Sequence, residues 1–320
     1  MNGIMLIEQG VDSHEGCRFV PPTLEENDQI QNDIRVVSNK RTSPILCTGC
    51  VTVNTYVVVF RSSTGEGSQV NQNAVNNQII ILNQRFADTP FRFNLVETQF
   101  VVNNNWYLSM EDQFAEIGTA YRRGTLRDLN IYIGGINSGS TAFFPPVRPV
   151  DGSFFIGDGT FVAIDTLPGG TSSCCNLGLT LVHEVGHFFG LHHTFEGNSC
   201  ADGNPGDYVD DTPQQSVATD FDCPASANSC PNQPFNDPIN NYMDYSSDEC
   251  YTNFSPGQVR RMFYVWSLYR DDDETCPSDH VLFELQLNTD SASSSETNWQ
   301  LTSTDGEIAW GSSKDDSGLD

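Results

Sequence analysis

The segment HEVGHFFGLHH, residues 183–193, constrains this chain more than any other feature. It contains four of the six histidines among the 320 residues. Residues 180–189 have the composition of a helix, and helical side chains four positions apart lie one above the other on the same face. His183 and His187 can therefore bind a single metal ion. The short pattern HExxH is a weak signal, whereas the full spacing HExxHxxGxxH is specific.

A third imidazole one helical turn further along would point away from that ion, so the chain has to turn back. Gly190 permits the turn, because glycine adopts the left-handed conformation that ends helices. His193 then completes a set of three ligands. Three neutral imidazoles leave the fourth position of a tetrahedral zinc ion for water, which predicts a catalytic site. His192 is a competing ligand, but its position breaks the spacing, and we expect it at the surface or behind the ligands.

Glu184 follows the first ligand and is rotated from it by about 100° around the helix axis. Its carboxylate is therefore expected beside the metal and not on it. Zinc lowers the pKa of bound water to about 7. Glu184 is the expected general base, which takes a proton from that water and returns it to the leaving amine. Two alternatives are buried histidines without a metal and a metal site without turnover, and the second requires Glu184 to be absent.

Charge and hydropathy exclude two classes of function. The chain has 15 Lys and Arg against 42 Asp and Glu, a net charge of −27. Proteins that bind nucleic acid need clustered basic residues, so we expect no nucleic-acid partner. The longest apolar runs, at 56–60 and 79–82, fall far short of the roughly 20 residues that cross a bilayer. We expect a monomer that does not insert into membranes.

Ten cysteines indicate an oxidising compartment. Residues 1–10 have no basic start and too short an apolar run for a signal peptide. Either an export signal has been removed or none existed, and we expect a secreted protein. The acidity is expected to keep its surface solvated.

Strands alternate with helices along the middle of the chain. The expected strands are 51–60, 91–101, 129–136, 153–156 and 161–165, and the expected helices are 24–36, 70–86, 106–123, 180–189 and one that begins at Ser255. Capping boxes at Thr23 and Ser255 support two of these helices. This order predicts an α/β fold with a sheet layered by helices.

Composition divides the chain into three parts. Residues 1–45 are polar and are interpreted as a pro-segment, and residues 46–276 as the catalytic domain. Within that domain, residues 197–238 carry too little apolar surface to pack regularly and need another means of support. Residues 277–320 alternate apolar and polar side chains and are interpreted as the truncated start of a C-terminal β module, with too few strands for its own core.

The histidine segment resembles the zinc signature of the metzincin metalloproteases, and NYMDYSSDEC, residues 241–250, resembles their Met-turn. Together with GDYVDDTP at 206–213 and FSPGQVRRM at 254–262, the pattern is most similar to the pappalysin family, on its smaller secreted, cytophagalysin-like side. The resemblance covers residues 45–275. It implies an α+β metzincin fold, in which a twisted mixed five-stranded sheet with backing and active-site helices precedes an irregular, disulfide-stapled lower subdomain that ends in a helix.

The resemblance implies roles for three further residues. Met243 would form an apolar floor beneath the ligands. Tyr245 would donate a hydrogen bond to the tetrahedral oxyanion, although without the family it would be interpreted as packing. Asp248 would lie at the base of the pocket for the residue after the scissile bond and favour Arg or Lys there. We also expect the strand at 161–165 to be the sheet edge that holds an extended substrate.

Cysteine pairing is open on the residues alone, because four cysteines in the loop region allow three connectivities. Those four are Cys200, Cys223, Cys230 and Cys250. The resemblance favours Cys200 with Cys230 and Cys223 with Cys250. Adjacent Cys174 and Cys175 are not expected to bridge each other, and Cys47, Cys50 and Cys276 have no assigned partners.

Two regulatory features also rest on the resemblance. Asp207, with backbone carbonyls near Val209 and Thr212, is similar to a calcium site of the family, and oxygen ligands of this kind suit calcium. The alternative is a solvated acidic loop. Cys17 stands where relatives carry the cysteine that blocks zinc in the zymogen, although Arg18 and the next residue depart from the family pattern.

The sequence therefore predicts a secreted zinc endopeptidase that acts on protein or peptide substrates. An adhesion or matrix-binding protein that uses calcium and keeps the protease fold as a scaffold is the alternative from another class. A peptidase restricted to one regulatory protein fits the same residues. Glu184 discriminates between enzyme and scaffold, because a scaffold has no need of a general base.

Overall fold

Five strands form one mixed sheet with the order β2-β1-β3-β5-β4. They are β1 (Val51–Arg61), β2 (Phe91–Val102), β3 (Leu129–Gly134), β4 (Thr141–Ala142) and β5 (Thr160–Ala163). Neighbouring strands are parallel except β4, which pairs antiparallel with β5. The computed structural model describes residues 22–40, 49, 51–135, 140–142, 158–201, 203–271, 296–303 and 306–314. The mixed α/β fold that the sequence predicts is confirmed.

The expectation that residues 161–165 form the sheet edge is wrong. β5 lies between β3 and β4, and the edge strand is β4. All four residues of β5 are buried, as expected for an inner strand of a sheet that is covered on both faces. The two residues of β4 are too few to produce a recognisable alternation in the sequence. The expected strand at 153–156 lies outside the described residues, as do Cys17, Cys47, Cys50 and Cys276.

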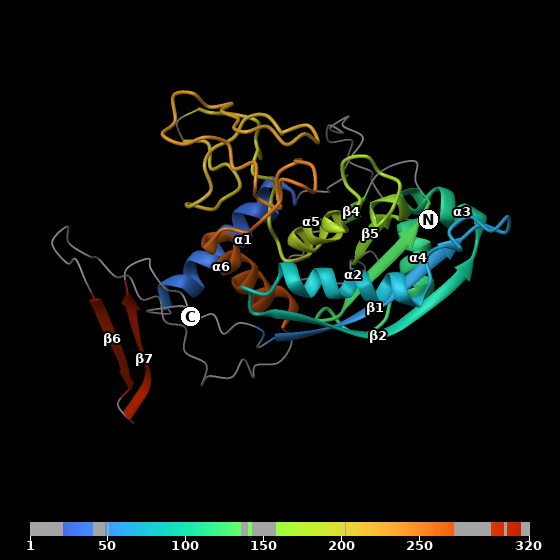
Figure 1. Cartoon of the computed structure of the whole chain (residues 1–320), viewed down its shortest axis with the longest axis horizontal. Coiled ribbons are helices and arrows are strands. Elements are labelled where there is room, and N and C mark those ends of the chain that lie inside the picture. The colour runs from blue at the N-terminus through green and yellow to red at the C-terminus, as the bar shows by residue number, and fades with distance from the viewer. Residues whose placement is uncertain are drawn as a thin grey trace. The chain divides into compact units, whose positions relative to one another are not determined.

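Helices cover both faces of the sheet (Figure 1). α2 (Gln72–Arg85) and α5 (Leu179–Phe188) lie against one face. The opposite face carries Phe60, whose ring contacts Trp106 of α3 (Asn104–Leu108) and Tyr121 of α4 (Phe114–Tyr121). The expected single helix over 106–123 is thus divided, since the backbone of Ser109 is not helical and a short 3₁₀ turn, Met110–Gln113, follows it.

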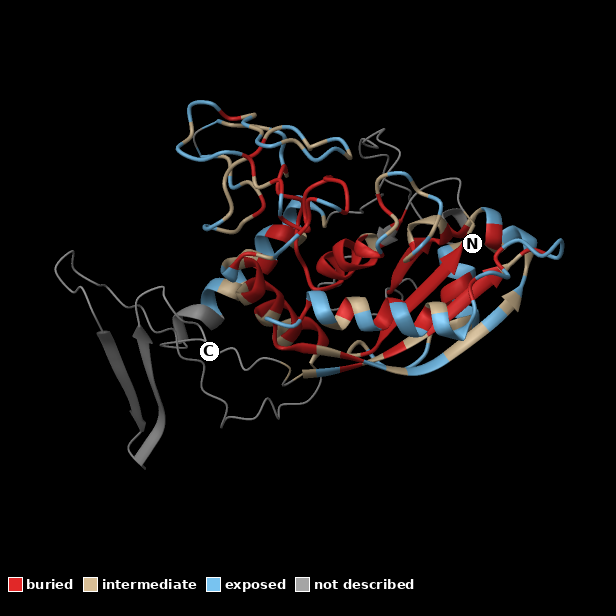
Figure 2. Ribbon diagram, in the orientation of Figure 1, coloured by how far each residue is buried: buried red, intermediate tan, exposed pale blue. Residues whose placement is uncertain are grey.

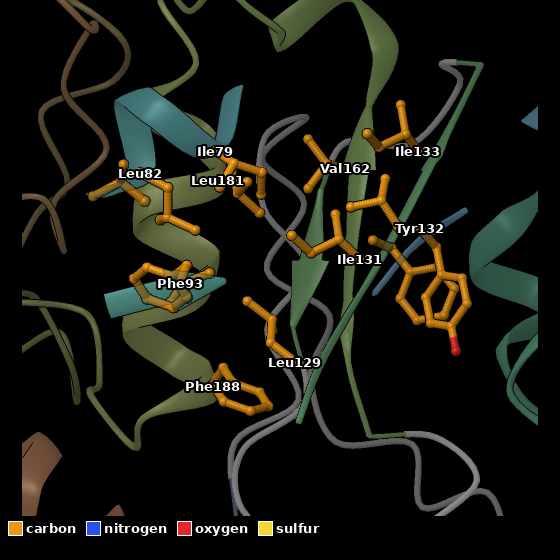
Figure 3. Close-up of a cluster of buried hydrophobic side chains, with 14 of the residues drawn as sticks. Ile79, Leu82, Phe93, Leu129, Ile131, Tyr132, Ile133, Val162, Leu181 and Phe188 are labelled. Carbon is orange, nitrogen blue, oxygen red and sulfur yellow. The ribbon is translucent and has the colours of Figure 1, made fainter. Parts of the chain in front are cut away.

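The core lies between α5 and the sheet. Leu129, Ile131 and Val162 point from the strands toward α5, whereas Tyr132 points to the opposite face (Figure 3). All four side chains are at most 1% exposed. Burial on both faces explains why apolar side chains point to both sides of these strands, although β3 also buries Asn130 and β5 also buries Thr160. In Figure 2 the sheet centre and α5 are buried, and the segments between 197 and 240 are largely exposed or intermediate.

The C-terminal helix α6 (Pro256–Val265) begins with the predicted capping box between Ser255 and Gln258. It continues as a π-helical turn, Trp266–Arg270. α1 (Leu24–Lys40) packs against α6 through fully buried Ile30. This contact places the described part of the expected pro-segment on the C-terminal helix.

Residues 283–320 form a separate unit. Within it, β6 (Glu296–Ser303) and β7 (Gly306–Lys314) pair antiparallel. Among the described residues of the chain, no helix has the length and apolar character that crossing a membrane requires.

Candidate metal centre

Helix α5 carries the first two histidines of the candidate site. Its first turn follows Gly178, which has a φ of 83°. The Gln78 side chain of α2 donates a hydrogen bond of 2.9 Å to the Gly178 carbonyl and so ties the start of α5 to the neighbouring helix. His183 and His187 lie one turn apart on α5 and are both buried. The rings are 4.7 Å apart between centroids.

Gly190 turns the chain back after α5, as the sequence predicts. Its φ is 86°, and a Cβ atom at this position would clash with Val265 of α6. The Leu191 amide donates to the Gly186 carbonyl, which closes the end of the helix. Two arginines of the C-terminal segment hold this end: Arg261 Nε donates to the Gly190 carbonyl at 2.7 Å, and Arg270 Nε donates to the Phe188 carbonyl at 2.9 Å.

The turn brings His193 to the two helical histidines. His187 Nε2 lies 3.1 Å from His183 Nε2 and 3.0 Å from His193 Nε2. The three ligand nitrogens lie within 4.8 Å of one another. Three imidazole nitrogens at this separation surround a point where one metal ion fits.

Backbone carbonyls orient two of these rings. His183 Nδ1 lies 2.6 Å from the Tyr242 carbonyl, and His187 Nδ1 lies 2.7 Å from the Leu191 carbonyl. A carbonyl accepts hydrogen bonds and cannot donate, so each Nδ1 carries the proton and each Nε2 keeps its lone pair. These lone pairs converge, an arrangement that suits a cation between them.

Burial keeps the three imidazoles neutral. It lowers the pKa of His183 to about 4, against the opposing effect of the Tyr242 carbonyl. Burial and the neighbouring histidines hold the pKa values of His187 and His193 well below the ordinary value. Neutral imidazole is the form that binds metals.

His192 does not join the cluster. Its ring is buried and packs 5.2 Å from the ring of Tyr208, and its Nδ1 lies 3.6 Å from Glu196. The three-nitrogen group contains His183, His187 and His193. Glu184 lies on α5 next to the first of these and has no exposed surface.

The Met-turn segment passes beneath α5. Met243 is fully buried, and Gly186 of α5 allows its close approach, because a Cβ atom at Gly186 would clash with the Met243 sulfur. The Met243 carbonyl accepts a hydrogen bond of 3.1 Å from the amide of Thr194. Asn241 and Gln258 exchange two side-chain hydrogen bonds and fix this segment to α6.

Tyr245 packs against the histidine cluster. Its ring lies 4.7 Å from that of His193 and 5.7 Å from that of His183. The Tyr245 ring also stacks on the ring of Phe221, with the centroids 5.6 Å apart. Tyr245 is 5% exposed, so its position beside the ligands is defined by packing.

The sequence reasoning missed a buried polar group that joins the third histidine to the Met-turn. Gln215 accepts a hydrogen bond of 2.7 Å from Thr194 Oγ1 and donates one of 3.0 Å to Asp244 Oδ1. Asp244 also accepts hydrogen bonds from Thr219. Thr194 follows His193, and Asp244 follows Met243, so this group holds both segments. Gln215 lies in irregular chain, where no periodicity marks it.

Asp248 lies against the start of α5. Its Oδ2 accepts a 2.6 Å hydrogen bond from the Leu177 amide, and its own amide donates to the Cys174 carbonyl at 3.0 Å. The side chain is buried, and Oδ1 has no hydrogen-bond partner. Burial raises the pKa of Asp248 to about 6, opposed by the nearby amides of Leu177 and Leu179 and by Arg85.

The described residues contain three disulfides. Cys200–Cys230 and Cys223–Cys250 are the pairs that the family resemblance favours. The expectation for Cys174 and Cys175 is wrong, because these adjacent residues are bonded to each other. Adjacency makes the ring small but does not forbid it, since the peptide between the two residues lies in a turn outside regular structure.

Asp207 lies in the loop region and is 4% exposed. Its Oδ1 accepts hydrogen bonds from the Val209 amide at 3.1 Å and from Thr212 Oγ1 at 2.7 Å. Its Oδ2 is buried without a hydrogen-bond partner. Burial raises the pKa of Asp207 to about 7.

Comparison with known proteins points to one family. The peptidase M43 model, described as pregnancy-associated plasma protein-A, matches residues 158–266. An extracellular metalloprotease of Colletotrichum graminicola is 36% identical over 267 residues, which cover 81% of this chain and 92% of the relative. One of Neurospora crassa is 41% identical over 223 residues, 69% of this chain and 76% of the relative.

Two solved structures share the fold. A promirolysin variant of Tannerella forsythia aligns with a TM-score of 0.59 at 21% identity and covers 78% of this chain and 90% of its own. Mature mirolysin of the same organism, in complex with a cleaved peptide, aligns with a TM-score of 0.57 at 22% identity. The alignment covers 70% of this chain and 97% of the mirolysin chain.

Proposed function

The chain belongs to the pappalysin family of metalloproteases, peptidase family M43, and we propose that it is a secreted zinc endopeptidase acting on protein or peptide substrates. The proposal rests on one observation: three imidazole nitrogens converge next to the buried side chain of Glu184. The names of the relatives and the three disulfides support an extracellular location.

His183, His187 and His193 are the proposed zinc ligands. Three nitrogen ligands leave one position of a tetrahedral ion open, which is the arrangement of catalytic zinc. The bound ion would polarise the scissile carbonyl and acidify a water molecule. The carbonyl partners of His183 and His187 hold both rings with Nε2 directed toward the position that the ion would occupy.

Glu184 is the proposed general base. Its carboxylate accepts a proton from the attacking water and passes it to the nitrogen of the leaving amine. The complete burial of Glu184 supports this role, because a charge excluded from water interacts more strongly with the reacting groups.

Tyr245 and Met243 are proposed to support the reaction. The Tyr245 ring lies next to His183 and His193, from where its hydroxyl can stabilise the developing oxyanion. Met243 forms the apolar floor under α5, with Gly186 providing the space.

Asp248 is proposed to select Arg or Lys after the scissile bond. Its buried Oδ1 has lone pairs without a hydrogen-bond partner and would accept from a cationic substrate side chain. The segment around Asp248 contacts the start of α5, which connects this carboxylate to the helix that carries the ligands.

Asp207 and the carbonyls of Val209 and Thr212 are the proposed ligands of a calcium ion. The buried Asp207 Oδ2 supports this assignment. Limited proteolysis with and without calcium would test it. Calcium is expected to slow cleavage of the loop region, because an ion bound by the buried carboxylate stabilises the folded loop.

The proposed domain organisation keeps residues 1–45 as a pro-segment, residues 46–276 as the catalytic domain and residues 277–320 as a β module. Cys17 is the proposed latency residue. Removal of residues 1–45 predicts that activation cleaves the chain between α1 and β1. Mass spectrometry of the activated protein measures where its N-terminus lies and so tests this boundary.

The peptidase proposal is tested with a casein or peptide digest by the chain freed of residues 1–45. Glu184→Ala is expected to lower the rate by about 10³-fold, and a zinc chelator to abolish it. His192→Ala serves as the matched control and should keep both zinc and activity. A wild type that binds zinc but cleaves nothing would support the adhesive scaffold function instead.

A further inference from the structure

The loop that enters α5 contains the disulfide between adjacent residues Cys174 and Cys175. A bond between neighbours closes a small ring and removes most of the backbone freedom of the turn. Hydrogen bonds fix the loop at two further points. The Ser172 amide donates to the Asp165 carbonyl at 3.2 Å, and the Gly169 amide donates to the Asn176 carbonyl at 2.9 Å.

This ring contacts Asp248 through the backbone. The Asp248 amide donates to the Cys174 carbonyl at 3.0 Å, and the Leu177 amide returns a 2.6 Å hydrogen bond to Asp248 Oδ2. The two segments thus hold each other on either side of the Asp248 side chain. The Cys174 carbonyl is thus in direct contact with the Asp248 amide.

A second disulfide holds the other side of the same segment. Cys250 is bonded to Cys223, and the Ser247 amide donates to the Asp222 carbonyl at 3.0 Å. Asp248 therefore lies between two covalently closed parts of the chain. Its Oδ2 accepts the hydrogen bond from the Leu177 amide, whereas Oδ1 has no hydrogen-bond partner.

A buried carboxylate oxygen without a partner is costly unless a donor reaches it. Asp248 is 3% exposed, so water does not provide that donor freely. A cationic side chain of a substrate that approached Oδ1 could supply the missing hydrogen-bond donor. A flexible loop would let the carboxylate turn toward neighbouring amides instead.

We propose that the Cys174–Cys175 ring is a positioning device for Asp248 and thereby sets selectivity for a basic residue after the scissile bond. The inference rests on the proposed function of Asp248. The ring acts through the Cys174 carbonyl and does not itself contact the substrate. It keeps Asp248 Oδ1 directed away from the Leu177 amide.

The test compares wild type with the double variant Cys174→Ser/Cys175→Ser. The substrates are two peptides that differ after the scissile bond, one with Arg and one with uncharged, similarly shaped citrulline. The ratio of kcat/KM values, Arg over citrulline, should fall about tenfold in the variant, while kcat/KM for citrulline stays within about threefold. Cys200→Ser/Cys230→Ser is the matched control and should keep the wild-type ratio.

Unchanged selectivity in the double variant overturns the inference, as does a peptide map of the native protein with free thiols at Cys174 and Cys175. If Asp248→Asn keeps the wild-type ratio, the proposed role of Asp248 is wrong and the inference fails with it. If Asp248→Asn loses the ratio and the double variant keeps it, the inference alone fails. Should the double variant not fold, the ratio is measured on native enzyme after limited reduction, with the opened bond identified by mass spectrometry.

Discussion

Two regions of the catalytic unit are stabilised in different ways. The sheet half, the described residues between 51 and 190, has β3 and β5 entirely buried and α5 packed against them. The loop half, residues 191–254, has little regular structure and is held by two disulfides and by buried polar side chains such as Asp244. Apolar burial orders the first half, and covalent and polar links order the second.

The candidate metal centre lies where these halves meet. The sheet half provides His183, His187 and Glu184 on one rigid helix. The loop half provides His193, Met243 and Tyr245. A metal bound by all three histidines would therefore join two regions that fold for different reasons.

Removing the metal should have the largest effect. With a zinc chelator, we expect cleavage to fall to the background rate and amide hydrogen exchange to become faster in the loop half. Exchange in β1 and β3 should stay slow, because apolar packing protects these strands. Exchange that rises equally in both halves would contradict the distinction between them.

A cavity in the sheet half should be the next largest perturbation. Ile131 is 1% exposed, and Ile131→Ala should lower the free energy of unfolding by about 4 kcal/mol, from lost burial plus an unfilled cavity. Denaturant unfolding measures the change. Ile80 is 54% exposed and provides the control Ile80→Ala, for which a small effect is expected.

Opening a disulfide of the loop half should cost less and act locally. Cys200 and Cys230 are separated by 30 residues, and Cys200→Ser/Cys230→Ser should lower the free energy of unfolding by about 3.6 kcal/mol in the chain-entropy model. Limited proteolysis should then cut first between 200 and 240. Cuts that appear first in the sheet half would contradict this expectation. The Cys174–Cys175 bond encloses no intervening residues, so Cys174→Ser/Cys175→Ser should lower the free energy of unfolding far less.

The smallest effect concerns pH. Burial raises the pKa of Asp248 to about 6, so its carboxylate is charged above that pH and neutral below it. With peptides that carry Lys or norleucine after the scissile bond, the kcat/KM ratio should be highest above pH 6. Below pH 6 this kcat/KM ratio should fall by up to about tenfold per pH unit. Asp248→Asn should give a low ratio at every pH, and a variant that keeps the wild-type profile would exclude Asp248 as the group that titrates.

The sequence predicted the sheet half well because its signals are periodic. β1, α2, β2 and β3 follow runs of apolar residues at strand or helix spacing, and Gly190 marks the end of α5. The edge strand was misplaced because β4 has two residues, which carry no pattern. Its pairing with β5 depends on tertiary structure.

The loop half could be predicted only through family resemblance. Neither Gln215 nor Asp244 belongs to a periodic segment, so their hydrogen bonds to Thr194 and to each other left no local signal. The Cys174–Cys175 bond contradicted a general expectation about adjacent cysteines. Polar networks and small rings depend on where side chains meet, and composition does not encode this.

One zinc ion is expected to join the two halves through His183, His187 and His193. X-ray diffraction data recorded at the zinc absorption edge would locate this ion. We expect one anomalous peak in the catalytic unit, between the three Nε2 atoms, which disappears in His193→Ala and persists in His192→Ala. A peak bound by His192, or no peak at this position in a protein that cleaves peptides, would show that the three histidines do not form the zinc site.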